Sequence, residues 1–291
     1  MGLHTDLVAE ETGGGSLKRP GHSRGRDDSR PGWAVPVLTA RSGGPAERLA
    51  AMLAGKHPAI TFVAVLVPAF VAFAALSIGI GFLVTHLLLH VAGVNSADEN
   101  AIVWLAQHRT STGTDASFVG SSIAGGLVLP ILVGSIALVC LLRRQWRIAA
   151  FIVFALVVES ALYRATTLVI HRHRPNVVRL EHLQVNASYP SGHTAAAVAV
   201  YAGLVLLLTS RFKNGALRTL AWTIAIAIPL FVAASRMYRG MHHPIDTVGG
   251  AAVGVAAVIV VVFACRVAGA TAKSWKRGSA AVTPPQVEEP Q

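Results

Sequence analysis

The chain has 291 residues, of which 53% are hydrophobic and only 13% are charged, and its mean hydropathy is +0.55. This composition is too apolar for an ordinary soluble domain, so it predicts a protein that crosses a membrane several times. The formal net charge of +11 suits either nucleic-acid binding or basic cytoplasmic loops, and its placement along the chain favours the loops. Cys140 and Cys265 fall within or beside apolar runs, which predicts buried free thiols rather than a disulfide framework or a metal-ligand cluster.

Residues 1–57 are rich in Gly, Ser, Pro, Arg and Asp and show no sustained apolar periodicity. We expect a disordered, basic, cytoplasmic tail, with a short interfacial helix near Ala46 to Leu53. The first apolar run starts too far from the amino terminus for a simple secretory signal peptide, so we expect it to remain as a membrane anchor. Residues 269–291 are predicted to form a second disordered cytoplasmic tail.

The region 58–268 is predicted to be a membrane domain made only of helices. A helix needs about 17 to 25 apolar residues to cross a bilayer, and six stretches of the chain reach or nearly reach this length. They are Ile60–Leu88, Val119–Leu142, Ile148–Ile170, Thr194–Leu208, Leu217–Ala234 and Ile245–Val267. The prediction is therefore an all-α, polytopic bundle of six transmembrane helices.

The charges between these stretches predict the orientation of the bundle. By the positive-inside rule, loops rich in Lys and Arg stay in the cytoplasm. The second loop, the fourth loop and both tails are basic, whereas the first loop, Val91 to Phe118, carries Asp98, Glu99 and Asp115 against a lone Arg109. Both termini are therefore predicted to be cytoplasmic, and the first, third and fifth loops are predicted to be extracytoplasmic.

The third and fifth loops carry arginines that the same rule would place inside, which marks these loops as functional. Three polar clusters result: His171-Arg172-His173-Arg174-Pro175, Tyr189-Pro190-Ser191-Gly192-His193, and the stretch from Ser235 to Asp246. All three return to the predicted extracytoplasmic face, as a composite active site requires. The alternative is that these residues only anchor helix ends at the membrane surface.

The last cluster predicts half of a phosphoryl-transfer site. Pro244 is tolerated in the first turn of a helix, so a helix that begins near His243 places Asp246 about one turn from His242. A carboxylate there fixes the imidazole tautomer and makes His242 a candidate nucleophile. His243 is the alternative nucleophile, and only the three-residue gap before Asp246 favours His242 over it.

Pro190-Ser191-Gly192-His193 opens the fourth apolar stretch, where the backbone N–H groups of a helix start attract an anion. Gly192 lets a phosphate approach the main chain closely, and Ser191 either caps the helix or donates to a phosphate oxygen. His193 is placed to act as general acid on a departing oxygen. Arg236, in the third cluster, adds a planar fork of donors that matches phosphate geometry.

Together these motifs resemble the three-part signature of the type 2 phosphatidic acid phosphatase superfamily, the lipid phosphate phosphatases. The family pattern is Lys-x6-Arg-Pro, then Pro-Ser-Gly-His, then Ser-Arg-x5-His-x3-Asp. Arg174-Pro175 matches the end of the first part, residues 190–193 match the second, and Ser235-Arg236 with His242 and Asp246 match the third. The resemblance covers roughly Ile60 to Val267 and leaves both tails out.

The resemblance implies a role for each matched residue. It implies that His242 attacks phosphorus and forms a phosphohistidine, that Asp246 orients His242, and that His193 protonates the leaving oxygen and activates water afterwards. The implied phosphate ligands are Arg174, Arg236, Ser191 and the Gly192 amide. No metal or other cofactor is required, because arginines and a helix terminus compensate the developing charge. The spacings of the remaining external histidines do not resemble a compact zinc ligand set.

The first motif departs from the family pattern. Thr167 occupies the position where the family has Lys, so one phosphate-binding cation is missing. Three compensations are open: Arg172 in the same loop, a snorkelling Arg164 one turn below Thr167, or the Thr167 hydroxyl as a neutral donor. We favour Arg172 as the simplest and include it among the predicted phosphate ligands.

Two charged residues fall inside the third apolar stretch, where a charge costs about 2.5 to 3.5 kcal/mol on insertion scales. Glu159 and Arg164 lie roughly 140° apart around a helix, so they are poorly placed to pair with each other. We expect each to face the bundle interior, either as a structural contact or, for Glu159, as a catalytic group. In the sixth stretch, Gly250 and Gly254 predict close helix packing.

The sequence therefore predicts an integral-membrane hydrolase that acts on a lipid phosphomonoester or diphosphate through a phosphohistidine, without metal. Isoprenyl diphosphates, phosphatidic acid and related lipids are candidate substrates by family analogy. A phosphotransferase that uses the same intermediate, and a non-catalytic protein that binds or transports lipid phosphate, are the alternatives. The expected location is the plasma membrane, with membrane lipids as neighbours, no nucleic-acid partner, and protein partners left open.

Overall fold

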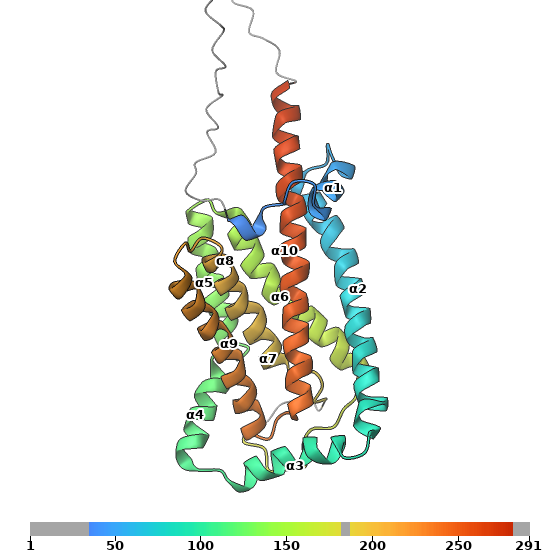
Figure 1. Ribbon diagram of the computed structural model, residues 1–291, viewed down its shortest axis with the longest axis vertical. Helices are drawn as coiled ribbons and strands as arrows, with labels where there is room; N and C mark the ends of the chain where they lie inside the picture. Colours follow the sequence, from blue (N-terminus) through green and yellow to red (C-terminus); the bar gives the residue numbers. More distant parts are fainter. Residues whose placement is uncertain (1–34, 182–186, 282–291) are drawn as a thin grey trace, which may run out of the picture. The chain divides into compact units, whose positions relative to one another are not determined.

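The computed structural model of the protein describes residues 35–181 and 187–281, with side chains to residue 275. Every regular element in these ranges is helical, so the predicted all-α class is confirmed (Figure 1). Five helical segments are long and apolar enough to cross a membrane: Pro58–His90, Trp146–Val169, Gly192–Thr209, Gly215–Tyr238 and Pro244–Trp275. The apolar helix Val128–Leu142 is shorter, so a multi-pass protein is supported but the count of six spanning helices is not confirmed.

The helices follow the predicted order along the chain. They are η1 (Pro36–Leu38), α1 (Pro45–Met52), α2 (Pro58–His86), η2 (Leu88–His90), α3 (Val94–Gln107), α4 (Ser111–Ser122), α5 (Val128–Leu142), α6 (Trp146–Val169), α7 (Gly192–Ala197), η3 (Val198–Ala202), α8 (Gly203–Thr209), α9 (Gly215–Tyr238) and α10 (Pro244–Ala281). η3 is a π-helical turn that joins α7 and α8 into one span. α3 lies across the end of the bundle where α9 ends and α10 begins (Figure 1).

The predicted second span, Val119–Leu142, is wrong in its first part. α4 ends at Ser122, and the chain passes through a turn that contains Gly125 and Gly126 before α5 begins. Glycine costs about 1 kcal/mol relative to alanine in a helix interior, so two in succession favour a break that hydropathy does not register. α5 is about 22 Å long at 1.5 Å per residue, and α4 packs against α9.

The described part of the predicted amino-terminal tail is ordered, in contrast to the expectation. The interfacial helix expected near Ala46 to Leu53 corresponds to α1, which packs against α10 and buries Ala46 and Ala50. Arg147 donates to the Leu38 carbonyl, so η1 is also bound to the bundle. At the other end, α10 continues past the predicted boundary at 268 to Ala281. Residues 1–34 and 282–291 lie outside the described residues.

Close packing between α7 and α10 fixes the start of α7. A Cβ added at Gly250 would lie 2.3 Å from the Ser191 carbonyl oxygen, and one at Gly254 would lie 2.4 Å from the Ala195 carbonyl oxygen. The predicted role of these two glycines in helix packing is therefore confirmed. The Ser191 N–H also donates to the Asp246 carbonyl at 2.9 Å, so the second and third sequence motifs are joined by backbone contacts.

Of the remaining expectations for the bundle, two are confirmed and one is wrong. Cys140 and Cys265 are buried free thiols, as predicted. Glu159 is buried on α6, also as predicted, whereas Arg164 is exposed, so the expectation that it faces the bundle interior is wrong. Arg164 lies near the end of α6, where a long, exposed side chain can snorkel toward the membrane surface.

Candidate active site

The three polar clusters predicted from the sequence meet at one end of the bundle. The loop after α6 carries Arg172 and Arg174, the start of α7 carries His193, and the turn between α9 and α10 carries His242. Most of these side chains are buried, although they are charged or polar. Such burial is costly unless each group has a partner, so the contacts of each one are informative.

His242 is held in one tautomer by the main chain. Its Nδ1 lies 2.7 Å from the Ser188 carbonyl oxygen, which can only accept, so Nδ1 carries the proton. Nε2 is left with its lone pair, and Nη1 of Arg174 lies 3.5 Å from it. Burial holds the pKa of His242 well below its usual value; Asp246 opposes this shift and the neighbouring arginines add to it. A neutral imidazole whose Nε2 carries a lone pair is the form that can attack phosphorus.

Asp246 supports His242 indirectly. Its Oδ2 lies 3.9 Å from His242 Nδ1, beyond hydrogen-bond length, so the direct contact expected from the sequence is only a charge interaction. Instead Oδ2 accepts from the Ser188 hydroxyl, and thereby holds the residue whose carbonyl orients His242. Ser188 is fully buried, and no motif in the sequence pointed to it.

His243 is held between two carboxylates. Its Nε2 lies 2.7 Å from Glu99 and its Nδ1 lies 3.2 Å from Asp246, whose Oδ2 also accepts from the His243 backbone N–H. Burial alone would lower the pKa of His243, but its hydrogen bonds to Asp246 and Glu99 outweigh burial and raise it. Because both ring nitrogens are engaged, His243 is a weaker candidate nucleophile than His242.

Arg172 is committed to acidic partners. Its Nη1 lies 2.5 Å from Asp246, and its Nη2 donates to Asp98 on α3. Asp98 also accepts from the Ile245 backbone N–H at 3.0 Å, at the start of α10. This arrangement disagrees with the expectation that Arg172 replaces the missing lysine, because two carboxylates neutralise its charge before any phosphate arrives. Asp98 comes from the first loop, and the sequence analysis used it only to predict the orientation of the bundle.

Arg174 and Arg236 are the other two arginines expected to bind phosphate. Arg174 donates to the Met241 carbonyl at 2.6 Å, and burial lowers its pKa. Arg236 is fully buried, and its Nη1 donates to Ser121 and, at 2.5 Å, to Glu181. Its Nε and Nη2 are buried and have no hydrogen-bond partner among the described residues. Buried guanidinium donors without a partner suit an anionic ligand.

The second motif contributes backbone and hydroxyl groups. Ser191 does not cap α7 through its side chain; its hydroxyl lies 3.0 Å from that of Thr194. Gly192 faces the ring of Tyr163, which a Cβ at this position would meet at 3.0 Å. The Thr167 hydroxyl is buried without a hydrogen-bond partner among the described residues, one turn beyond Tyr163 on the same face of α6.

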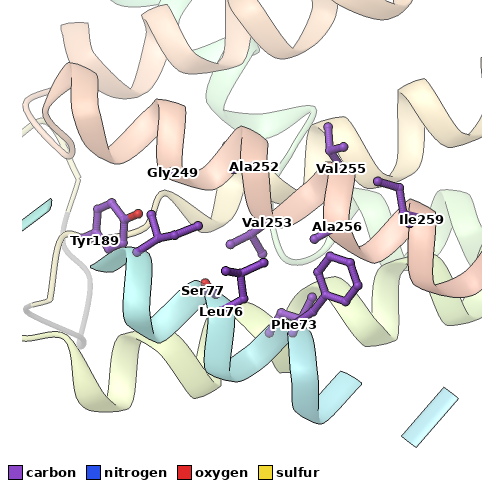
Figure 2. Close-up of a pocket in the computed structure, with 12 residues that line it drawn as sticks. Phe73, Leu76, Ser77, Tyr189, Gly249, Ala252, Val253, Val255, Ala256 and Ile259 are labelled. Atoms are coloured by element: carbon purple, nitrogen blue, oxygen red, sulfur yellow. The ribbon is translucent and has the colours of Figure 1, made fainter. Parts of the chain in front are cut away.

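A cavity of about 520 Å³ brings some of these groups together, although Arg236, Ser191 and Thr167 are not among the residues that line it. His193, His242, Arg174 and Gly192 line it beside Glu159, Ser160 and Tyr163 of α6, and the Gly125-Gly126 turn borders it. Glu159 accepts from the Ser160 hydroxyl at 3.2 Å. A second cavity of about 320 Å³ lies between α2 and α10, as Figure 2 shows. Its lining is almost wholly apolar, with Tyr189 at one end, so it lacks the groups that chemistry on a phosphate needs.

Among the residues with described side chains, no group of three or more His, Cys, Asp or Glu is arranged to hold a metal ion. The cations of the site are arginines.

Comparison with known proteins agrees with the motifs. Residues 148–268 match the family model described as the PAP2 superfamily. The resemblance to this superfamily is thereby confirmed. The matched segment begins in α6 and ends in α10, so it contains all three motifs and the helices that carry His193 and Asp246.

Individual relatives extend the match beyond this segment. Phosphatidylglycerophosphatase B of Bacillus subtilis is 28% identical over 180 residues, which are 60% of this chain and 86% of that protein. An undecaprenyl-diphosphatase of Sulfolobus acidocaldarius is 32% identical over 119 residues, 39% of this chain and about half (53%) of that protein. The crystal structure of a transmembrane PAP2 type phosphatidylglycerolphosphate phosphatase from Bacillus subtilis shares the fold, with a TM-score of 0.55 and 21% identity over 76% of this chain and 97% of that one.

Proposed function

We propose that the protein is an integral-membrane lipid phosphatase that hydrolyses a phosphate monoester or diphosphate through a phosphohistidine on His242. The observation that carries the proposal is the state of His242. Its Nδ1 proton is bound by a backbone carbonyl, and the ring lines the same cavity as His193 and Arg174. This arrangement supplies a nucleophile, a general acid and a phosphate-binding cation in one place.

In the first half-reaction, Nε2 of His242 forms a bond to phosphorus while the bond from phosphorus to the lipid oxygen breaks. His193 gives its proton to that departing oxygen, so the lipid leaves as a neutral alcohol or, from a diphosphate, as a monophosphate. In the second half-reaction, His193 takes a proton from water, the water oxygen attacks phosphorus, and orthophosphate leaves His242. Arg174 and Arg236 balance the charge on the phosphoryl oxygens in both steps.

The substrate is proposed to be a lipid that reaches the site from the bilayer. Support comes from the membrane-spanning helices around the cavity and from relatives that are named for phosphatidylglycerophosphate and undecaprenyl diphosphate. We place the site on the extracytoplasmic face of the plasma membrane and both termini in the cytoplasm, because the loops at the opposite end of the bundle are the basic ones.

The test is phosphate release by the detergent-purified full chain in EDTA, from phosphatidic acid, phosphatidylglycerophosphate and a polyprenyl diphosphate. We expect release from at least one lipid and its loss in His242→Ala. His90→Ala, which removes an exposed histidine near α3, is the matched control and should retain activity. No release by the intact protein, or release that survives His242→Ala, would refute the proposal. Phosphate retained on an acceptor alcohol would indicate a transferase instead.

A further inference from the structure

Glu181 lies where no motif predicts a functional residue, yet it contacts the guanidinium groups of two arginines of the α9 end. Its Oε2 is 2.5 Å from Nη1 of Arg236, and its Oε1 accepts from Nε of Arg239. Oε1 also accepts from the Ser121 hydroxyl at 2.8 Å, and Ser121 in turn accepts from Arg236. The carboxylate thus bridges α4, α9 and the loop after α6.

Arg239 ties this bridge to the rest of the fold. Its Nη2 donates to the Leu180 carbonyl at 3.1 Å, and the Leu180 N–H donates back to the Arg239 carbonyl at 3.1 Å. The guanidinium also lies 5.7 Å from the ring centre of Phe118 on α4. Glu181 is therefore held by a neighbour whose own position is fixed by backbone and aromatic contacts.

The contacts of Glu181 determine which donors of Arg236 are occupied. A guanidinium has five N–H donors, of which Nη1 holds two. Both donors of Nη1 are directed to Glu181 and Ser121, whereas Nε and Nη2 are buried and unpartnered among the described residues. Nε and Nη2 form one side of the planar fork, and that side matches two oxygens of a phosphate. Glu181 occupies one edge of Arg236 and leaves the opposite edge for the anion.

We propose that Glu181, braced by Arg239, is a positioning residue that fixes Arg236 so that its Nε and Nη2 edge receives the phosphoryl group. This inference rests on the proposed function, because it assigns Arg236 to the substrate phosphate. Burial raises the pKa of Glu181, but Arg236, Ser121 and Arg239 outweigh burial and bring it to about 2. The carboxylate therefore stays ionised, and the bridge stays intact, throughout the pH range in which the protein can be assayed.

A different role for the same contact makes the opposite prediction. If Glu181 only occupied Arg236 as an internal competitor of the substrate, its removal would release a cation and strengthen anion binding. If it positions Arg236, its removal lets the guanidinium turn and weakens anion binding, although a repelling negative charge has gone. The sign of the change in phosphate affinity separates the two roles.

The experiment uses the purified full chain with inorganic phosphate as the probe. Phosphate affinity is measured from the rise in Tm with phosphate concentration, which needs no turnover, and from competitive inhibition of phosphate release. For Glu181→Gln and Arg239→Gln we expect about tenfold weaker phosphate binding, the scale of one charged hydrogen bond. Because the two residues act through one bridge, the double variant should be little worse than either single one.

Two further variants keep the test specific. Glu181→Asp retains the charge but is one methylene shorter, so a positioning role predicts partial loss, whereas a purely electrostatic role predicts none. Asp115→Asn removes an exposed acid of α4 and should leave phosphate affinity unchanged. Tm without phosphate and elution as a single species identify any variant that fails to fold, and Glu181→Asp then serves as the milder variant.

Tighter or unchanged phosphate binding in Glu181→Gln would overturn the inference, as would a wild-type protein whose Tm does not respond to phosphate. The outcome is separable from that of the proposed function. Phosphate binding that weakens as expected in a protein that releases no phosphate from lipids would leave the inference standing and refute the phosphatase. Phosphate release that depends on His242, together with tighter phosphate binding in Glu181→Gln, would support the phosphatase and refute the role proposed for Glu181.

Discussion

Replacing Ser188 by alanine tests how Asp246 acts on the proposed nucleophile. The Ser188 hydroxyl donates to Asp246, and the Ser188 carbonyl accepts from His242 Nδ1 at 2.7 Å. Asp246 itself is 3.9 Å from His242. If orientation passes through Ser188, then Ser188→Ala must impair His242 although it touches neither imidazole nor phosphate through its side chain.

The expected fall in kcat follows from the loss of the hydrogen bond between the Ser188 hydroxyl and Asp246. A hydrogen bond to a charged group contributes about 1.5 to 3 kcal/mol, and each 1.36 kcal/mol in the barrier is about tenfold in rate. If the loss appears fully in the transition state, kcat falls roughly 10- to 150-fold. KM should change little, because the substituted side chain does not belong to the phosphate-binding groups. Rapid-quench measurement of the phosphoenzyme should show that its formation is the slowed step.

The matched control is Ser210→Ala. That hydroxyl donates to the Leu207 carbonyl at 2.7 Å just after α8, away from the site, so the same substitution should change kcat by less than about twofold. Asp246→Asn should impair activity at least as much as Ser188→Ala, and the double variant should add little to it. Wild-type kcat in Ser188→Ala beside a strongly impaired Asp246→Asn would show that Asp246 reaches His242 directly during turnover.

Three other predictions concern packing, pH and the missing lysine. Gly250→Ala should lower the free energy of unfolding by more than about 2 kcal/mol, because a Cβ there meets a carbonyl oxygen at 2.3 Å; Gly134→Ala, with open space around it, should not. The pKa of His243 is raised, so its contribution to stability is complete below about pH 6.5 and is lost as pH rises through the folded pKa; Tm against pH should show this loss, and Glu99→Gln should reduce it. Thr167→Lys should tighten phosphate binding and lower the Tm measured without phosphate, because it places a cation at a buried position whose hydroxyl has no hydrogen-bond partner among the described residues. Weaker phosphate binding would show that residue 167 does not face the phosphate.

Local patterns in the sequence predicted the helices and the motif positions well. Long apolar runs are decisive for spans such as α2 and α9, since a helix satisfies all the backbone hydrogen bonds of a single segment within a bilayer. The α4–α5 break was missed because hydropathy averages over Gly125 and Gly126, whereas helix propensity acts at each residue. Hydropathy therefore predicted the existence of the spans better than it predicted where each one ends.

The partners of the motif residues could not be predicted in the same way. Glu99 and His243 are 144 residues apart, and Asp98 and Arg172 are 74 apart, so only the folded arrangement brings them together. Glu181 and Ser188 lie in a loop without periodicity, where neither spacing nor hydropathy distinguishes one polar residue from another. Arg172 illustrates the same limit: its residue type fits a phosphate ligand, but the sequence does not reveal its two carboxylate partners, Asp98 and Asp246.

The acids explain how so many arginines are buried at one end of a membrane bundle. An uncompensated buried charge costs several kcal/mol, so the fold gives carboxylate partners to Arg172 and Arg239. Arg236 keeps its Nε and Nη2 edge unpartnered among the described residues, so this edge can present charge to an anion. Because Asp98 comes from α3 and Glu181 from the loop after α6, the ion pairs that hold the arginines also join these two segments to the end of the bundle that carries the motifs. Substitutions in those segments should therefore change phosphate binding and stability together, since one set of contacts provides both.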